Sequence, residues 1–240
     1  MNTPTSLGII ILAGLIHSSF QLSISMVTLL SGHAIGSKAS ARHTMRMVGS
    51  FLAGVVVMTV LFISFLGYAA SQLFRHDAPP LAWSIVCGLM VGLGIAVWAF
   101  YYRRQKGTAL WLPRGFARFL TDRTKATHYS VESFSLGLTS VIAEGLFIAA
   151  PASAAALALI RFPAPLQLVG VGLYTIAASL GIFIVVVLIG SGHKLSRIQK
   201  WREDNKRFLQ FVAGSALLVL GFYAYVNTVL ASATISAGAY

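Results

Sequence analysis

The sequence predicts an all-α polytopic membrane protein: six transmembrane helices arranged as two inverted three-helix repeats, with both termini outside. The 240-residue chain is 57% hydrophobic and only 10% charged, with a mean hydropathy of +0.79. A soluble domain of this length does not need so much apolar surface. Apolar runs of at least about 18 residues are typical of spanning helices. Six such runs are present, at 8–30, 47–70, 82–102, 131–160, 166–190 and 208–230. They lack the period-two alternation of a barrel, so helices are expected.

The second observation is a set of short matches at a constant spacing of 123 residues. The matched pairs are Gly14-Leu15 with Gly137-Leu138, Val48-Gly49 with Val171-Gly172, and Leu66-Gly67 with Ile189-Gly190. The last two segments continue the pattern less regularly, with Gly88 and Gly214 at 126 and Gly94 and Gly221 at 127. Because three crossings return the chain in the opposite orientation, the repeat is expected to be inverted, with a working site near the midplane. The predicted units are 1–105 and 131–240, joined by a linker over 106–130.

The charge distribution is the third observation and sets the expected orientation. All Lys and Arg residues except Arg75 and Arg161 fall in three connections, 38–46, 103–125 and 194–207. These connections lie on one side of the predicted topology, so the positive-inside rule places them in the cytoplasm of a cell (inner) membrane protein. The net charge of +12 therefore does not indicate a nucleic-acid partner. The first apolar run is expected to be a spanning helix rather than a removed signal peptide.

The linker over 106–130 interleaves aromatic and basic side chains, for example Trp111 and Phe116 with Arg114 and Arg118. Such a stretch favours a membrane anchor on anionic lipid over a protein or RNA partner. Cys87 is the single cysteine, so no internal disulfide can form, and we interpret it as a packing residue.

Two ionisable residues inside apolar runs are the first candidates for chemistry. Glu144 is the only acidic residue deep inside such a run, and His17 is the only histidine in a comparable position. An ionised acid at the bilayer centre costs about 2.5 kcal/mol or more, so Glu144 should face the bundle interior and be paired, hydrated or protonated. That state suits a residue that loads and releases a proton. A plain interhelical hydrogen bond remains open for both residues.

Six further residues complete the predicted substrate and proton site: Gln21, Ser18, Ser25, Thr28, Ser140 and Pro151. Gln21 lies 123 residues before Glu144, and His17, Gln21 and Thr28 share one helix face. That face indicates a hydrated path or a substrate cavity. Membrane hydroxyls often bond back to their own helix, and this alternative stays open.

Pro151 removes one backbone donor from the fourth apolar run and frees the carbonyl of Phe147. A helix broken near the midplane can expose backbone groups to a ligand. A simple packing kink is the alternative. No glycine-rich phosphate loop is present, and the candidate metal ligands lie on separate segments, so no cofactor and no tight metal site are expected.

The pattern resembles the lysine exporter superfamily, which includes amino-acid and metal exporters and the membrane domain of thiol-disulfide carriers of cytochrome c maturation. The resemblance is clearest at 12–22, and the stretch 31–36 with Val48-Gly49 is similar to the exporters' first cytoplasmic loop. The carriers place a Pro-Cys pair seven and eight residues after a glycine. Here those positions hold Gln21 and Leu22, and in the second half Glu144 and Gly145. Electron-carrier activity is therefore not expected. The exporters' early Pro-Gly-Pro motif is also not present.

The function expected from these observations is a secondary, proton-coupled exporter of a small solute or cation, not an enzyme, with its site between the two repeats. A homodimer or a membrane partner would be compatible with this function. The alternative is a non-transporting membrane subunit or assembly factor that docks on another membrane complex. A membrane-embedded enzyme acting on lipid is a weaker hypothesis, because one acid and one histidine lack an additional nucleophile or orienting group.

Overall fold

The computed structural model describes residues 2–20, 24–27, 30, 41–101, 122–124, 127, 129–191 and 195–232. Within these residues the chain is helical and contains no strand. The elements are α1 (Thr3–Ser19), α3 (Ala41–Phe74), α4 (Pro80–Tyr101), α6 (Ser130–Leu159), α7 (Ala164–Gly190), α8 (Leu195–Asp204), α9 (Lys206–Tyr225) and a π-helical turn, η1 (Val226–Leu230).

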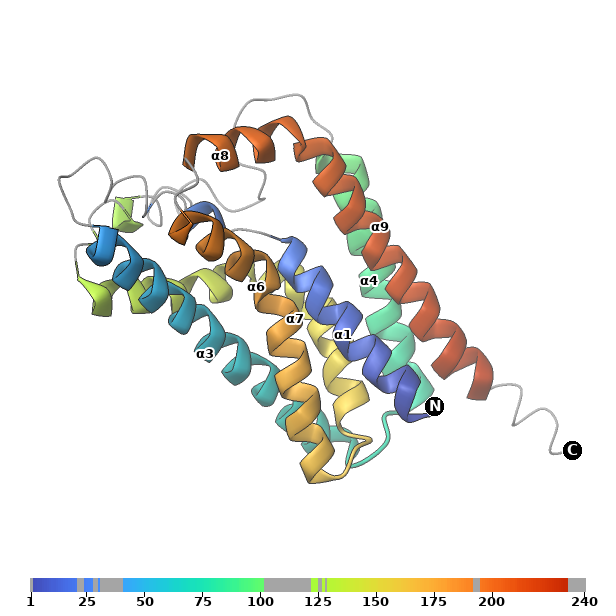
Figure 1. The fold of residues 1–240 in the computed structure, drawn as a ribbon. Coiled ribbons are helices and arrows are strands. Elements are labelled where there is room, and N and C mark those ends of the chain that lie inside the picture. Colours follow the sequence, from blue (N-terminus) through green and yellow to red (C-terminus); the bar gives the residue numbers. More distant parts are fainter. Residues whose placement is uncertain are drawn as a thin grey trace, which may run out of the picture.

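The six long helices pack side by side in one bundle (Figure 1). The α3–α4 and α6–α7 connections lie at one end, and the short helix α8 lies at the end opposite the N-terminus (Figure 1). α9 ends at the end of the bundle where α1 begins (Figure 1). The central helix is α6, whose described partners include α3, α1, α4, α7 and α9.

Five of these helices are long and apolar enough to cross a membrane. They correspond to the second to sixth predicted runs and differ from them by a few residues, because the length of an apolar run largely determines where a spanning helix begins and ends. The largest difference is α3, which starts at Ala41 and extends beyond the predicted 47–70 at both ends. The five spans are Arg42–Phe74, Pro80–Ala99, Ser130–Leu159, Ala164–Gly190 and Arg207–Leu230.

The first predicted run, 8–30, is not one continuous helix. α1 begins at Thr3, where the Asn2 side chain accepts a hydrogen bond from the backbone N–H of Thr5 at 3.1 Å. It ends at Ser19 after 17 residues, and Phe20 leaves the helical conformation with φ −86° and ψ 34°. Helical conformation returns at 24–27. The expected break of a helix near the site therefore falls in the first run rather than at Pro151, since α6 continues through Pro151 to Leu159.

Two glycines let α3 and α6 cross with their backbones in contact. A Cβ at Gly137 would meet the carbonyl oxygen of Phe51 and would lie 3.0 Å from the nitrogen of Val55. A Cβ at Gly54 would likewise meet the carbonyl oxygen of Phe134. Small residues let helix backbones approach closely where lipid removes the hydrophobic drive for association. This crossing therefore depends on the absence of side chains at both glycines.

The crossing of α1 with α7 repeats that contact. A Cβ at Gly14 would lie 2.7 Å from the carbonyl oxygen of Tyr174 and 3.3 Å from the nitrogen of Ala178. Each member of this set is offset by 123 residues from a member of the α3–α6 set: Gly14 from Gly137, Tyr174 from Phe51, and Ala178 from Val55. The 123-residue spacing of the sequence is thus also a spacing between equivalent backbone contacts.

The crossing of α4 with α9 has the same property at an offset of 127 residues. A Cβ at Gly94 would lie 3.0 Å from both the carbonyl oxygen of Gly214 and the Cγ of Leu218. A Cβ at Gly221 would lie 3.4 Å from the carbonyl oxygen of Cys87 and 3.0 Å from a methyl group of Val91. The second set is the first set with its two helices exchanged.

An ion pair joins the two connections at the end of the bundle near the N-terminus. Arg161 Nη2 lies 3.3 Å from Asp77 Oδ1, and 67% of the Asp77 side chain is exposed. Because an exposed pair is screened by water and salt, its contribution is small. We expect Asp77→Asn to change the free energy of unfolding by less than about 1 kcal/mol. Thermal unfolding in detergent at low and high salt measures this, and a loss of several kcal/mol would mean that the pair closes the bundle instead.

Candidate functional site

A buried carboxylate and a buried imidazole meet where α1 packs on α6. His17 Nε2 lies 3.5 Å from Glu144 Oε2, and each side chain is 4% exposed. The two residues are 127 positions apart in the sequence, and both were predicted site residues. The structure therefore brings the two ionisable residues of the predicted site into one contact.

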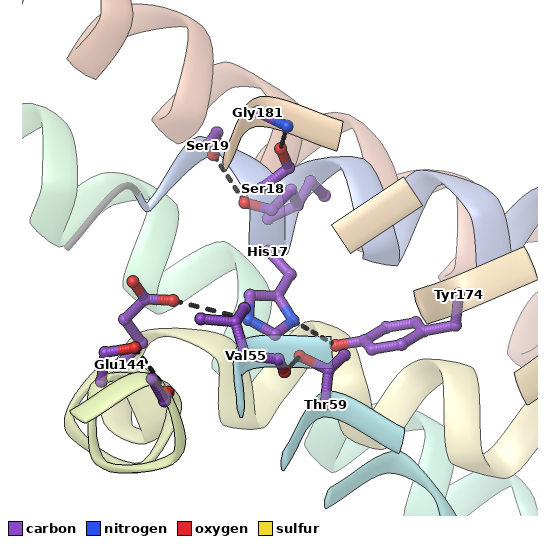
Figure 2. Close-up of polar contacts among 11 residues, drawn as sticks. His17, Ser18, Ser19, Val55, Thr59, Glu144, Tyr174 and Gly181 are labelled. Atoms are coloured by element: carbon purple, nitrogen blue, oxygen red, sulfur yellow. Dashed lines mark hydrogen bonds and ion pairs between the residues drawn. The ribbon is translucent and has the colours of Figure 1, made fainter. Parts of the chain in front are cut away.

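The other nitrogen of the imidazole contacts a third helix. His17 Nδ1 lies 3.1 Å from the hydroxyl of Tyr174 on α7, which is fully buried. The imidazole lies between the carboxylate and the phenol, as Figure 2 shows. Three helices, α6, α1 and α7, thus each contribute one ionisable side chain. We refer to Glu144, His17 and Tyr174 as the triad.

The triad lies close to the end of α1. His17 is in the last turn of this helix, and its carbonyl accepts a hydrogen bond from the N–H of Phe20 at 3.1 Å. The last carbonyl groups of a helix carry partial negative charge, which favours a cation in the last turn. The position of His17 therefore stabilises its protonated form opposite an ionised Glu144.

The residue after His17 binds the same partner helix. The backbone N–H of Gly181 on α7 donates to Ser18 Oγ at 2.9 Å. A Cβ at Gly181 would lie 2.8 Å from that oxygen, so a side chain at this position would displace the contact. Ser18 points away from the imidazole and toward Gly181 (Figure 2). This predicted site residue thus joins α1 to α7 and does not face the triad.

The other predicted site residues are distributed differently. Ser140 is fully buried and donates to the carbonyl of Gly137, within its own helix, at 2.7 Å. Ser25 is half-buried in the helical residues 24–27, and Pro151 is buried within α6. Gln21 and Thr28 lie outside the described residues. Of the eight predicted site residues, His17 and Glu144 contact each other in the part of the chain that the structure describes.

The geometry of the triad allows it to hold and move protons. A carboxylate, an imidazole and a phenol in a row can share protons through hydrogen bonds, and the imidazole has a nitrogen on each side. A proton that passes from Glu144 to His17 changes the charges of both groups and leaves the net charge of the pair unchanged. Such a pair can gain or lose one proton with little rearrangement of its neighbours.

No group of three or more His, Cys, Asp or Glu side chains lies together in the described ranges in a way that could hold a metal ion. The triad itself offers two such side chains, fewer than the three protein ligands that most zinc sites use. Its hydrogen-bonding groups face one another, which suits proton sharing better than ligation.

Tyr174 and Gly181 are the members of this region that sequence reasoning missed. A tyrosine in the middle of an apolar run is a usable signal, because a buried phenol usually requires a hydrogen-bond partner. The position 123 residues earlier holds Phe51, so Tyr174 is also where a hydroxyl breaks the repeat. That difference between equivalent positions indicates a specific partner for the hydroxyl.

Comparison with known proteins gives no significant match to a family model, a curated protein or a solved structure. The class of protein therefore rests on the fold and the site. It is an all-helical protein with five helices of membrane-spanning length, which are typical of a multi-pass membrane protein, and with a buried triad where three helices meet.

Proposed function

We propose that the protein is a proton-coupled secondary transporter, an exporter of a small solute or cation, in which Glu144 and His17 carry the proton. The observation that supports this most directly is the contact between their side chains, both almost fully buried. Charged groups in the hydrocarbon region cost several kcal/mol, and apolar residues of similar volume often replace a buried ion pair without loss of stability. An ionisable pair kept in such a place is therefore better explained by function than by stability.

The proposal includes an inverted repeat, with 1–105 and 131–240 as its two units and a sixth span that contains α1. The support is the recurrence of backbone contacts at 123 and 127 residues, with the roles of the helices exchanged. Inverted repeats are typical of carriers in which two similar halves move around a site at the midplane. The triad lies where helices of both units meet, since α1 belongs to the first unit and α6 and α7 belong to the second.

The proposed orientation has the basic connections in the cytoplasm of a cell membrane and both termini outside. α8 lies at the end of the bundle opposite the N-terminus (Figure 1). It exposes Arg197, Lys200 and Trp201 and buries Ile198. Basic and aromatic side chains on such a helix suit the headgroup region of anionic lipid. Of the linker over 106–130, which is proposed to bind the same lipid, the structure describes 122–124, 127, 129 and 130.

The lysine exporter superfamily is the proposed relationship, and it rests on the topology and on the glycine-based motifs of the sequence. The proposed arrangement of six spans fits it, and the positions of the carriers' cysteines hold Gln21, Leu22, Glu144 and Gly145. An ionisable pair in place of a redox pair suits a carrier of protons rather than of electrons.

The test of the function is Glu144→Gln in reconstituted vesicles. Purified protein is incorporated into phosphatidylethanolamine–phosphatidylglycerol vesicles that contain a pH-sensitive dye, under an imposed pH gradient. Common amino acids and monovalent and divalent cations are added singly, and the pH of the lumen is followed. We expect at least one of them to move protons with the wild-type protein and none with Glu144→Gln, because the amide cannot take up a proton.

The matched control is Glu132→Gln, the same substitution in the exposed first turn of α6. It should keep the wild-type flux. Proton-coupled flux that persists in Glu144→Gln would refute the proposal. A protein that co-purifies with another membrane complex and tolerates Glu144→Gln would instead support the non-transporting subunit.

A further inference from the structure

The hydroxyl of Tyr174 has no role in the proposed proton pair, although it contacts the imidazole at 3.1 Å. We propose that Tyr174 is a positioning residue that sets the tautomer and the ring orientation of His17, so that Nε2 faces Glu144. The triad is then a proton relay across three helices. The part of Tyr174 in transport rests on the proposed function, whereas its effect on the tautomer of His17 does not.

The hydrogen-bond inventory of the triad explains why a phenol is required. A neutral imidazole donates from one nitrogen and accepts at the other. With Glu144 ionised, Nε2–H donates to the carboxylate, so Nδ1 accepts from the hydroxyl of Tyr174. When the imidazole is protonated, both nitrogens donate and the phenol oxygen becomes the acceptor. The hydroxyl can rotate between these two roles, and phenylalanine could fill neither.

The relay step is a simple proton transfer. The carboxyl of a protonated Glu144 donates to Nε2 of a His17 that carries its proton on Nδ1. Transfer of the carboxyl proton to Nε2 leaves a carboxylate and an imidazolium with protons on both nitrogens. The Nδ1–H bond to the oxygen of Tyr174 is kept throughout. The phenol therefore holds the ring in place while the proton moves on its other side.

Backbone packing places Tyr174 at this position. α1 contacts α7 one turn before His17, where Gly14 lies against the carbonyl of Tyr174. It contacts α7 again directly after His17, where the N–H of Gly181 donates to Ser18. The segment that carries the imidazole is thus attached to α7 on both sides. The contact between His17 and Tyr174 follows from these two attachments.

The other titratable groups near α1 are too far along the helix to take this role. Of the helices that pack on α1, α6 presents Glu144 to the imidazole and α7 presents Tyr174. On α9, the hydroxyl of Tyr223 lies 4.0 Å from where a Cβ of Gly8 would stand, nine residues before His17. Among the described residues, the tautomer of His17 is therefore set by Glu144 and Tyr174.

The equivalent positions in the other half lack this arrangement. The residue 123 positions after His17 is Ser140, which bonds to its own helix, and the residue 123 positions before Tyr174 is Phe51. The backbone crossing at Phe51 is the same as that at Tyr174, but it presents a ring without a hydroxyl. The hydroxyl is therefore not needed for the helix crossing itself, which leaves the contact with His17 as its role.

The experiment is ¹⁵N NMR of purified protein with labelled histidine, in nanodiscs, at alkaline pH. The ring signals of His17 are identified by their loss in His17→Asn. In the wild-type protein we expect the Nε2–H tautomer to predominate. In Tyr174→Phe, the ratio of the two tautomers should change about fivefold toward Nδ1–H, as expected for the loss of one ordinary hydrogen bond. The control is Tyr225→Phe at the exposed end of α9, which should leave the ratio unchanged. An unchanged ratio in Tyr174→Phe would overturn the proposal.

A second measurement needs no substitution. Protein in which all eight tyrosines are replaced by 3-fluorotyrosine has more acidic phenols, so the Nδ1 signal of His17 should shift. This shift should be absent when Tyr174→Phe carries the same label. Loss of proton-coupled flux in Tyr174→Phe supports the relay. A changed tautomer with wild-type flux overturns the relay and leaves Glu144 and His17 as the proposed proton pair.

Discussion

Gly137→Leu is expected to prevent α3 and α6 from assuming their packed arrangement, so that the protein no longer purifies as a single folded species. The atoms that a Cβ at Gly137 would meet, the carbonyl oxygen of Phe51 and the nitrogen of Val55, belong to the backbone of α3. A side chain can rotate away from a new neighbour, but a helix backbone cannot. The two helices must therefore separate along their whole contact. Even Gly137→Ala should cost about 3 kcal/mol, the upper part of the range for overpacked sites.

The control for this effect is Gly145 on the same helix. Nothing lies within 4 Å of where a Cβ at Gly145 would stand. Gly145→Ala should therefore leave the free energy of unfolding unchanged or raise it by up to about 1 kcal/mol, since alanine is the better helix former. Size-exclusion chromatography and thermal unfolding in detergent measure both variants. Equal stability of Gly137→Ala and Gly145→Ala would show that the α3–α6 crossing is looser than described.

His17→Leu is expected to destabilise the protein more than the double replacement His17→Leu with Glu144→Leu. The single change removes the imidazole from between a buried carboxyl and a buried phenol, and breaking a buried pair in this way typically costs about 3–5 kcal/mol. Replacing both members of the pair with apolar groups removes the carboxyl as well. The double variant should therefore recover at least about 1 kcal/mol of what the single variant loses.

This comparison is made by unfolding in mixed micelles of SDS and a mild detergent, followed by the fluorescence of the four tryptophans. Because the two side chains are in contact, the effects of the two single changes should not add. Additive losses would show that His17 and Glu144 stabilise the protein independently. In that case the pair would no longer support a shared proton.

Both results bear on how α1 differs from α6, its counterpart at an offset of 123 residues. α1 ends at Ser19, two residues after His17, whereas α6 passes through the equivalent region and through Pro151 without ending. The sequence indicated a broken helix near the site but assigned it to the proline. A proline removes one backbone hydrogen bond, and neighbouring helices can tolerate that loss in a membrane. Composition alone therefore does not decide which of the two helices ends.

The positions of the spanning helices and the identity of the ionisable residues inside them could be predicted from the sequence. An apolar run has to be long enough to cross the hydrocarbon region, and its length is visible in composition. α7, for example, spans Ala164–Gly190, close to the predicted 166–190. Glu144 and His17 stood out for the same reason, because a charge in such a run is costly and therefore rare.

What the tertiary structure alone decided is which side chains meet. Periodicity assigns a residue to a helix face, but it does not say which helix that face contacts or how closely. Here the answer comes from backbone contacts at Gly14 and Gly137, which set how α1 lies on α7 and how α3 lies on α6. These contacts bring Tyr174 to His17 across 157 positions of the sequence. The sequence by itself determined that a proton-carrying pair could exist, and the close approach of the helices made it a triad.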